Sequence, residues 1–142
     1  MSMDITSANA TVVLDVQGLF SAELQQFSAD ASFTGDNIQM AEVRMGVDGK
    51  LVAGQVNSIK TVTINLEASS PSLSFMTLLR QSMDVNRKIY ECNMIINVPS
   101  IGKRYSLSKG VLESCKALPD GNRVLAPTTW TFNFEQLNEE GL

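Results

Sequence analysis

The sequence predicts a mainly β protein, an antiparallel β-sandwich or barrel with one flanking α-helix. Three observations lead to this class. Several segments alternate apolar and polar residues with a period of two, as half-buried strands do. Turn sequences rich in Gly, Asp, Asn and Pro separate these segments at regular spacing. Residues 71–83 have a helical period instead, and a lone amphipathic helix among strands is expected to cover a sheet face.

Alternation defines the strands. It is strictest at 61–68 and 128–135, where polar Thr and Asn alternate with apolar residues. Residues 103–118 are either two strands or one long strand bent at Gly110. The remaining strand predictions are 10–17, 23–33, 38–47 and 89–98. The total is seven to nine strands, and Trp130, Phe132 and Phe134 are expected in the core.

The helix has its own start signal and its own apolar stripe. The hydroxyl of Ser70 can accept a hydrogen bond from a first-turn amide, and Pro71 suits the first helical position. We interpret the serines of this stretch as helix capping. The stripe predicted to face the sheet consists of Phe75, Leu78, Leu79 and Met83.

Residues 46–54 predict a projecting hairpin. Asp48-Gly49 is a strong hairpin-turn sequence and is expected to form a type I′ turn. Apolar residues near its tip have few core partners, so it is either an ordinary exposed hairpin or an arm that packs on another subunit. The contact residues of such an arm would be Val47, Asp48, Gly49, Lys50, Leu51 and Val52.

Composition excludes several kinds of chemistry. The 142 residues include no histidine, two cysteines, 11 basic and 15 acidic residues, a net charge of −4. The absence of histidine removes the usual catalytic triads and most zinc sites, so we expect no enzyme activity, no cofactor and no metal. The candidate acid pairs, Asp30 with Asp36 and Glu139 with Glu140, lie in turns or near the end of the chain. The sequence has no basic patch of the kind that sequence-specific DNA- or RNA-binding proteins carry, so we do not expect such binding.

The chain is expected to be a single domain over 1–142. Residues 1–10 predict a flexible N-terminal arm, and the acidic residues 136–142 predict a mobile tail. No apolar run suits a membrane helix and no signal peptide is evident, so we expect cytoplasmic synthesis and no membrane anchoring. The polar strand faces, rich in Thr and Asn with few charges, suit a water-filled channel, a contact between subunits or an ordinary solvated face.

The order of these elements resembles the tail tube proteins of bacteriophages, particularly those with contractile tails. The resemblance rests on the hairpin at 46–54, the strand at 61–68, the helix at 71–83 and the aromatic strand at 128–135. It implies hexameric rings stacked into a tube, a fold shared with the tubes of type VI secretion systems and pyocins. The hairpin at 47–52 and the segment 1–10 would join ring to ring.

The resemblance also implies partners and a location. The chain would contact copies of itself and the sheath, baseplate and tail terminator proteins, and DNA would pass through the lumen without specific binding. It would be assembled in the host bacterial cytoplasm and reside in the virion tail. The alternatives are a type VI or pyocin-like tube subunit, a small-molecule-binding β-barrel, and a histidine-free hydrolase built on an acid pair.

Overall fold

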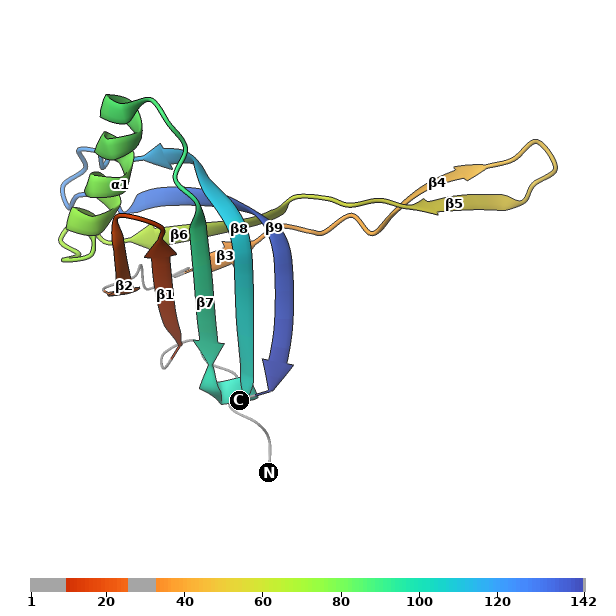
Figure 1. The fold of residues 1–142 in the computed structure, drawn as a ribbon, viewed down its shortest axis with the longest axis horizontal. Coiled ribbons are helices and arrows are strands. Elements are labelled where there is room, and N and C mark those ends of the chain that lie inside the picture. Colours follow the sequence, from red (N-terminus) through yellow and green to blue (C-terminus); the bar gives the residue numbers. More distant parts are fainter. Residues whose placement is uncertain (1–9, 26–32, 142) are drawn as a thin grey trace.

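The structure, a computed structural model, describes residues 10–25 and 33–141. These residues form a seven-stranded sheet, a separate two-stranded ribbon and one α-helix (Figure 1). The predicted mainly β class with one helix is confirmed. The strands of the sheet are β1 (Thr11–Val16), β2 (Phe20–Leu24), β3 (Phe33–Gly35), β6 (Lys60–Leu66), β7 (Cys92–Val98), β8 (Lys103–Lys116) and β9 (Thr128–Gly141). The ribbon is β4 (Ala41–Met45) and β5 (Leu51–Gln55), the helix is α1 (Leu73–Asn86), and a 3-10 turn, η1 (Pro99–Ile101), joins β7 to β8.

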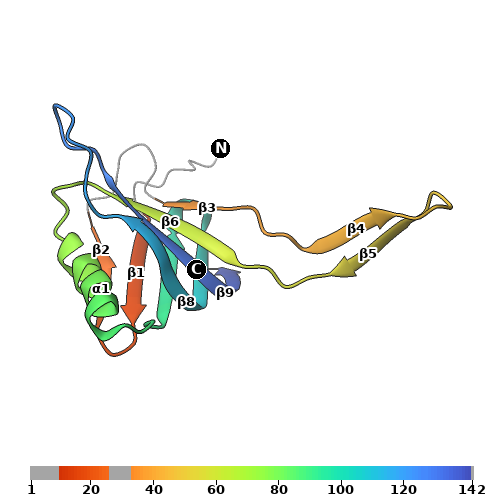
Figure 2. The same cartoon turned by 90° about the horizontal axis from the view of Figure 1, so that it is seen from above.

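The sheet is antiparallel throughout and open. Its strand order is β2-β1-β7-β8-β9-β6-β3, so β2 and β3 are its two edges. The sheet curves strongly, as the two views in Figures 1 and 2 show. Closing it would require β2 to pair with β3. Over the described residues these strands do not pair, so the sheet does not close into a barrel.

The β8–β9 hairpin is long and bends in the middle. The sequence left undecided whether the segment 103–118 forms one strand or two. In the structure it is one strand, from Lys103 to Lys116. The bend lies at Lys109, whose φ is 55°, next to Gly110. The pairing of the two strands passes there from Ser108–Gln136 to Gly110–Phe134. The bend divides the hairpin into a half that also pairs with β6 and a half that extends beyond it.

The C-terminal residues belong to β9. The sequence predicts a mobile tail over 136–142, but residues 136–141 pair with residues 103–108 of β8. The acidic side chains that suggested a solvated tail have basic partners on β8. Glu139 forms an ion pair with Lys103, and Glu140 lies 3.8 Å from Arg104. The prediction is therefore wrong over 136–141, because cross-strand partners lie too far away in sequence to be recognised locally.

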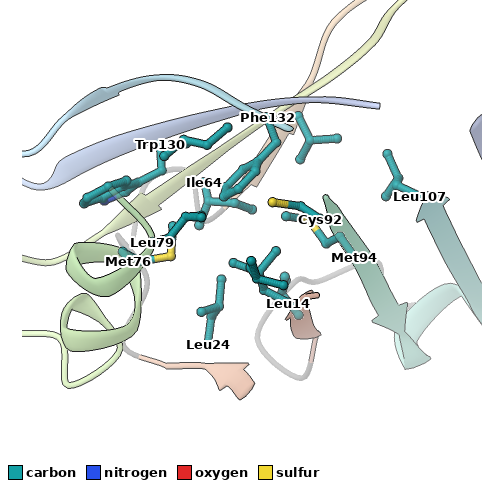
Figure 3. Close-up of a cluster of buried hydrophobic side chains, with 14 of the residues drawn as sticks. Leu14, Leu24, Ile64, Met76, Leu79, Cys92, Met94, Leu107, Trp130 and Phe132 are labelled. Carbon is teal, nitrogen blue, oxygen red and sulfur yellow. The ribbon is translucent and has the colours of Figure 1, made fainter. Parts of the chain in front are cut away.

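The core lies on the concave face of the sheet, with α1 over one end (Figures 1 and 3). Trp130, Phe132 and Phe134 are buried there, as predicted. From the helix, Met76 and Leu79 point into the same cluster (Figure 3), and Met83 packs at its margin.

The buried face of α1 is rotated from the predicted stripe. Phe75 remains 37% exposed and Leu78 43% exposed, while Met76 is fully buried. The side of the helix that faces the core carries Ser72, Met76, Leu79 and Met83, at spacings of four, three and four residues. Phe75 instead contacts Phe20 of β2, with ring centroids 5.2 Å apart.

Serines before α1 bind the helix to the edge of the sheet. The Ser72 hydroxyl accepts a hydrogen bond from the Gln25 amide (2.8 Å), and the Ser70 hydroxyl donates to the Gln25 carbonyl. Ser70 also accepts from the Ser72 amide (3.3 Å). The predicted capping role is wrong, because α1 begins only at Leu73: its N-cap is Ser72, which makes no side-chain cap hydrogen bond, and Ser70 and Pro71 precede the helix. The bonds to Gln25, 45 and 47 residues away in sequence, are a tertiary role that capping alone does not include.

Candidate assembly surface

The ribbon β4–β5 is an arm that extends away from the sheet (Figures 1 and 2). We call residues 41–55 the arm. All the residues of its two strands are exposed. The arm is longer than the predicted hairpin at 46–54, because the pairing of its strands continues to Ala41 and Gln55.

The turn at the tip differs from the predicted type I′ turn. Gly49 has a φ of 80°, and Asp48 is not among the residues with positive φ. The Gly46 amide donates to the Lys50 carbonyl (2.8 Å), and the Gly49 amide donates to the Gly46 carbonyl (3.0 Å). This is a three-residue loop with its glycine in the left-handed region, a common alternative to the two-residue turn. The Asp48 carboxylate also accepts a hydrogen bond from the Lys50 amide.

The arm has one apolar face and one mixed face. Residues directly opposite each other in an antiparallel ladder share a face, and successive pairs alternate. The pairs Val43–Ala53 and Met45–Leu51 therefore lie on one face. The pairs Glu42–Gly54 and Arg44–Val52 lie on the other. The apolar face touches no other described part of the chain, and contiguous exposed apolar surface of this kind marks interaction sites.

An apolar pocket opens in the sheet beyond the region that α1 covers. It has a volume of about 370 Å³. Its walls include Ile38 before the arm, Val98 at the end of β7, Ile101 after it, and Tyr105 and Leu137 from the outer half of the β8–β9 hairpin. These five side chains are partly or wholly buried, and the helix that completes the core elsewhere does not reach them.

The face of the sheet opposite the core, which we call the outer face, is polar, and its side chains hydrogen-bond to one another. Between β6 and β9, Thr61 donates to Asn133 (2.8 Å) and Thr129 donates to Asn65 (3.1 Å). A second ladder crosses β1, β7 and β8: Asn97 donates to Thr11 (3.2 Å), and Arg104 donates to Asn97 (2.9 Å). The Thr- and Asn-rich faces noted in the sequence thus form side-chain networks, which hold the surface in one arrangement.

Titratable side chains form no reactive centre in the described part of the chain. No three His, Cys, Asp or Glu side chains gather there closely enough to hold a metal ion. Glu139 and Glu140 each face a basic residue, and Asp30 of the other candidate acid pair lies outside the described residues. The hydrogen bond from Lys103 to Glu139 raises the pKa of that lysine.

Both cysteines are free. Burial raises the pKa of the Cys92 thiol to about 12, so it stays protonated at neutral pH. Burial also raises the pKa of Cys115, which is only partly covered. Cys92 acts as an apolar packing residue.

The sequence-predicted arm residues all lie together at the tip and along β5. The predicted set misses Val43 and Met45, which extend the same apolar face. Their alternation was visible in the sequence, but it is indistinguishable from that of a core strand. Residues 1–9 of the predicted N-terminal arm lie outside the described residues. No helix in the described part of the chain is long and apolar enough to cross a lipid bilayer.

Comparison with solved structures defines the class of fold. A chain of the anti-feeding prophage cap superposes with a TM-score of 0.68 at 12% identity, covering 100% of this chain and 94% of that one. A chain of the sheath/tube terminator of an extracellular contractile injection system, PVC, gives 0.67 at 12% identity, with 99% of each chain covered. A chain of the PVC sheath–tube complex gives 0.65 at 12% identity, with 92% and 88% covered. The fold is thus the one used by components of contractile injection systems, and the predicted tail-tube-like fold is confirmed.

Sequence comparison places the chain in a family. The family model described as tail fiber protein gp32 matches residues 3–138, and the chain belongs to this family. No curated protein matches the sequence.

Proposed function

We propose that the protein is a non-enzymatic structural subunit of a tail-like tube, which copies of the chain build by stacking as rings. The observation that carries this proposal is the arm, whose apolar face has no partner among the described residues of its own chain. Burying the face in a neighbouring copy would remove it from water, at about 25 cal/mol per Å² of apolar surface. Membership of a tail protein family and the contractile-system fold support the same role.

The finer features of the proposal follow from the resemblance to tail tube proteins. The rings are hexameric, the arm at 47–52 joins one ring to the next, and residues 1–10 add a second contact. One domain spans 1–142. The partners are the sheath, baseplate and terminator proteins, in line with the assemblies in which the fold neighbours occur. The protein is assembled in the host cytoplasm, resides in the virion tail, and lines a lumen through which DNA passes without specific binding.

The fold neighbours bear on the kind of particle to which the tube belongs. They come from an anti-feeding prophage and an extracellular contractile injection system, which supports a tube in an injection particle as the alternative to a DNA-delivering phage tail. A component of a tail fibre is the second candidate, favoured by the description of the family. The two differ in form, since a tube has a central channel and a fibre does not.

Electron microscopy of the purified full-length chain tests the proposal. Negative staining over rising protein concentration is expected to reveal rings or tubes with a central channel. A variant lacking residues 47–52 is expected to keep the β-rich circular dichroism spectrum of the folded chain and to form neither. Solid filaments would favour the fibre, and uniform monomers at every concentration would contradict assembly. Loss of the folded spectrum in the deletion variant would mean that the arm belongs to the core.

A further inference from the structure

Strand β9 has a free edge over its outer half. Its partner on one side, β8, follows it along its whole length, from Thr129 to Gly141. Its partner on the other side, β6, pairs only as far as Lys60 with Phe134, where the chain leaves for the arm. Among the described residues, no strand pairs with this side of residues 135–141, which we call the β9 edge. Half the backbone N–H and C=O groups of the β9 edge therefore point away from the sheet.

The β9 edge borders two hollows. A groove of about 780 Å³ runs beside it, lined by residues 57–60, Lys109 and residues 133–138. The apolar pocket described above lies next to this groove, since Lys60 and Leu137 line both. A segment that fits this place needs a free strand edge to pair with β9 and an apolar face to cover the pocket.

The arm has both properties. It is a two-stranded ribbon, so the outer sides of β4 and β5 are unpaired, and its apolar face carries Val43, Met45 and Leu51. The arm of the same chain extends away from the sheet (Figures 1 and 2). We infer that the arm of a second copy adds as a strand to the β9 edge and places its apolar face over the pocket. This inference rests on the proposed function, because it names the site that receives the arm.

Such a contact has a direction. The arm and the β9 edge are different surfaces of the chain, so each copy gives an arm to one neighbour and receives one from another. Contacts of this head-to-tail kind produce closed rings or open-ended stacks rather than isolated pairs. Backbone pairing supplies the affinity, and the alternating side chains of the arm supply the specificity.

Hydrogen exchange tests the inference on the assembled protein. Mass spectrometry compares wild-type assemblies with the unassembled variant lacking residues 47–52. Amide exchange in residues 135–141 is expected to slow by about tenfold or more on assembly, because the outward amides gain strand partners. Exchange in β1 serves as the control, since both of its sides are already paired.

Cross-linking identifies the donor of the added strand. In a Cys115→Ala background, Leu51→Cys chains mixed with Leu137→Cys chains are expected to form a disulfide-linked dimer under mild oxidation. Chains carrying Thr131→Cys, on the outer face of β9, are expected to remain monomeric under denaturing electrophoresis.

The outcomes separate the two proposals. Rings or tubes without protection of residues 135–141, or with cross-linking to Thr131→Cys alone, would overturn the strand addition and leave the structural role standing. Failure of the wild-type chain to assemble at any concentration would overturn the proposed function and this inference with it.

Discussion

Gly110 shows how one residue sets the shape of the β8–β9 hairpin. A Cβ atom added to it would lie 2.2 Å from Phe134 Cδ1 and 2.8 Å from the Asn133 carbonyl oxygen. The hairpin can bend here because nothing larger than hydrogen separates the β8 backbone from the Phe134 ring. Gly110 pairs with Phe134 at the point where the pairing of β9 with β6 ends, so this close contact lies at the start of the β9 edge.

Substitution of Gly110 by alanine is expected to destabilise the fold. The added methyl group overpacks the contact with Phe134, which should lower the free energy of unfolding by about 1–3 kcal/mol. Urea denaturation followed by tryptophan fluorescence measures the change. Gly121→Ala is the matched control: nothing lies within 4 Å of its added Cβ, so a change within about 0.5 kcal/mol is expected. Equal effects of the two substitutions would contradict the steric explanation.

At the scale of elements, the arm and α1 show that the spacing of apolar residues does not by itself reveal which side of a strand or helix packs against the core. The arm alternates as the core strands do, yet both its faces are exposed. In α1 the core takes Met76 and Leu79, while Phe75 and Leu78 stay partly exposed. The arm keeps its ribbon through cross-strand pairing and the loop at Gly49 rather than through a core of its own.

Two adjacent residues of β5 separate the faces of the arm experimentally. Leu51 lies on the apolar face, 65% exposed, and Val52 lies on the opposite face, 49% exposed. Leu51→Asp is expected to abolish rings or tubes in electron micrographs, because it would bury an unpaired charge in the interface. Val52→Asp, the same change one residue away, is expected to leave assembly largely intact. Both variants should unfold at the wild-type urea midpoint, and equal loss of assembly would contradict a single docking face.

At the scale of the whole molecule, the charge distribution suits a surface that does not hold nucleic acid. The net charge is −4, and the basic residues of the outer half of the hairpin are paired: Lys103 with Glu139, and Arg104 with Glu140. The outer face of the sheet places Thr and Asn networks where a nucleic-acid-binding surface would carry Lys and Arg.

The chain is therefore expected not to bind duplex DNA. Fluorescence anisotropy of a labelled duplex should stay unchanged on addition of the protein at low salt, where electrostatic binding is strongest. A basic DNA-binding protein in the same buffer is the positive control. Binding that weakens steeply as salt is raised would reveal a basic surface and contradict the expectation.

Much of the fold could be predicted from local pattern. The strand predicted at 128–135 begins at Thr128 as expected but continues to Gly141. The strand at 61–68 and the helix at 71–83 are found within a few residues of their predicted bounds, because each is defined by a period within one segment. The tip of the arm could be placed for the same reason. Its turn type was wrong, since a three-residue loop requires positive φ at Gly49 alone.

The sequence by itself determined the class of the fold and the approximate positions of α1, β6 and the tip of the arm. Only the tertiary structure decided that residues 136–141 form a strand, that the alternating segment 41–45 lies outside the core, and that the sheet stays open beside β9. The physical reason is the distance over which each feature is specified. A period or a turn is encoded in neighbouring residues, whereas a strand partner such as Arg104 for Glu140 is supplied from far along the chain.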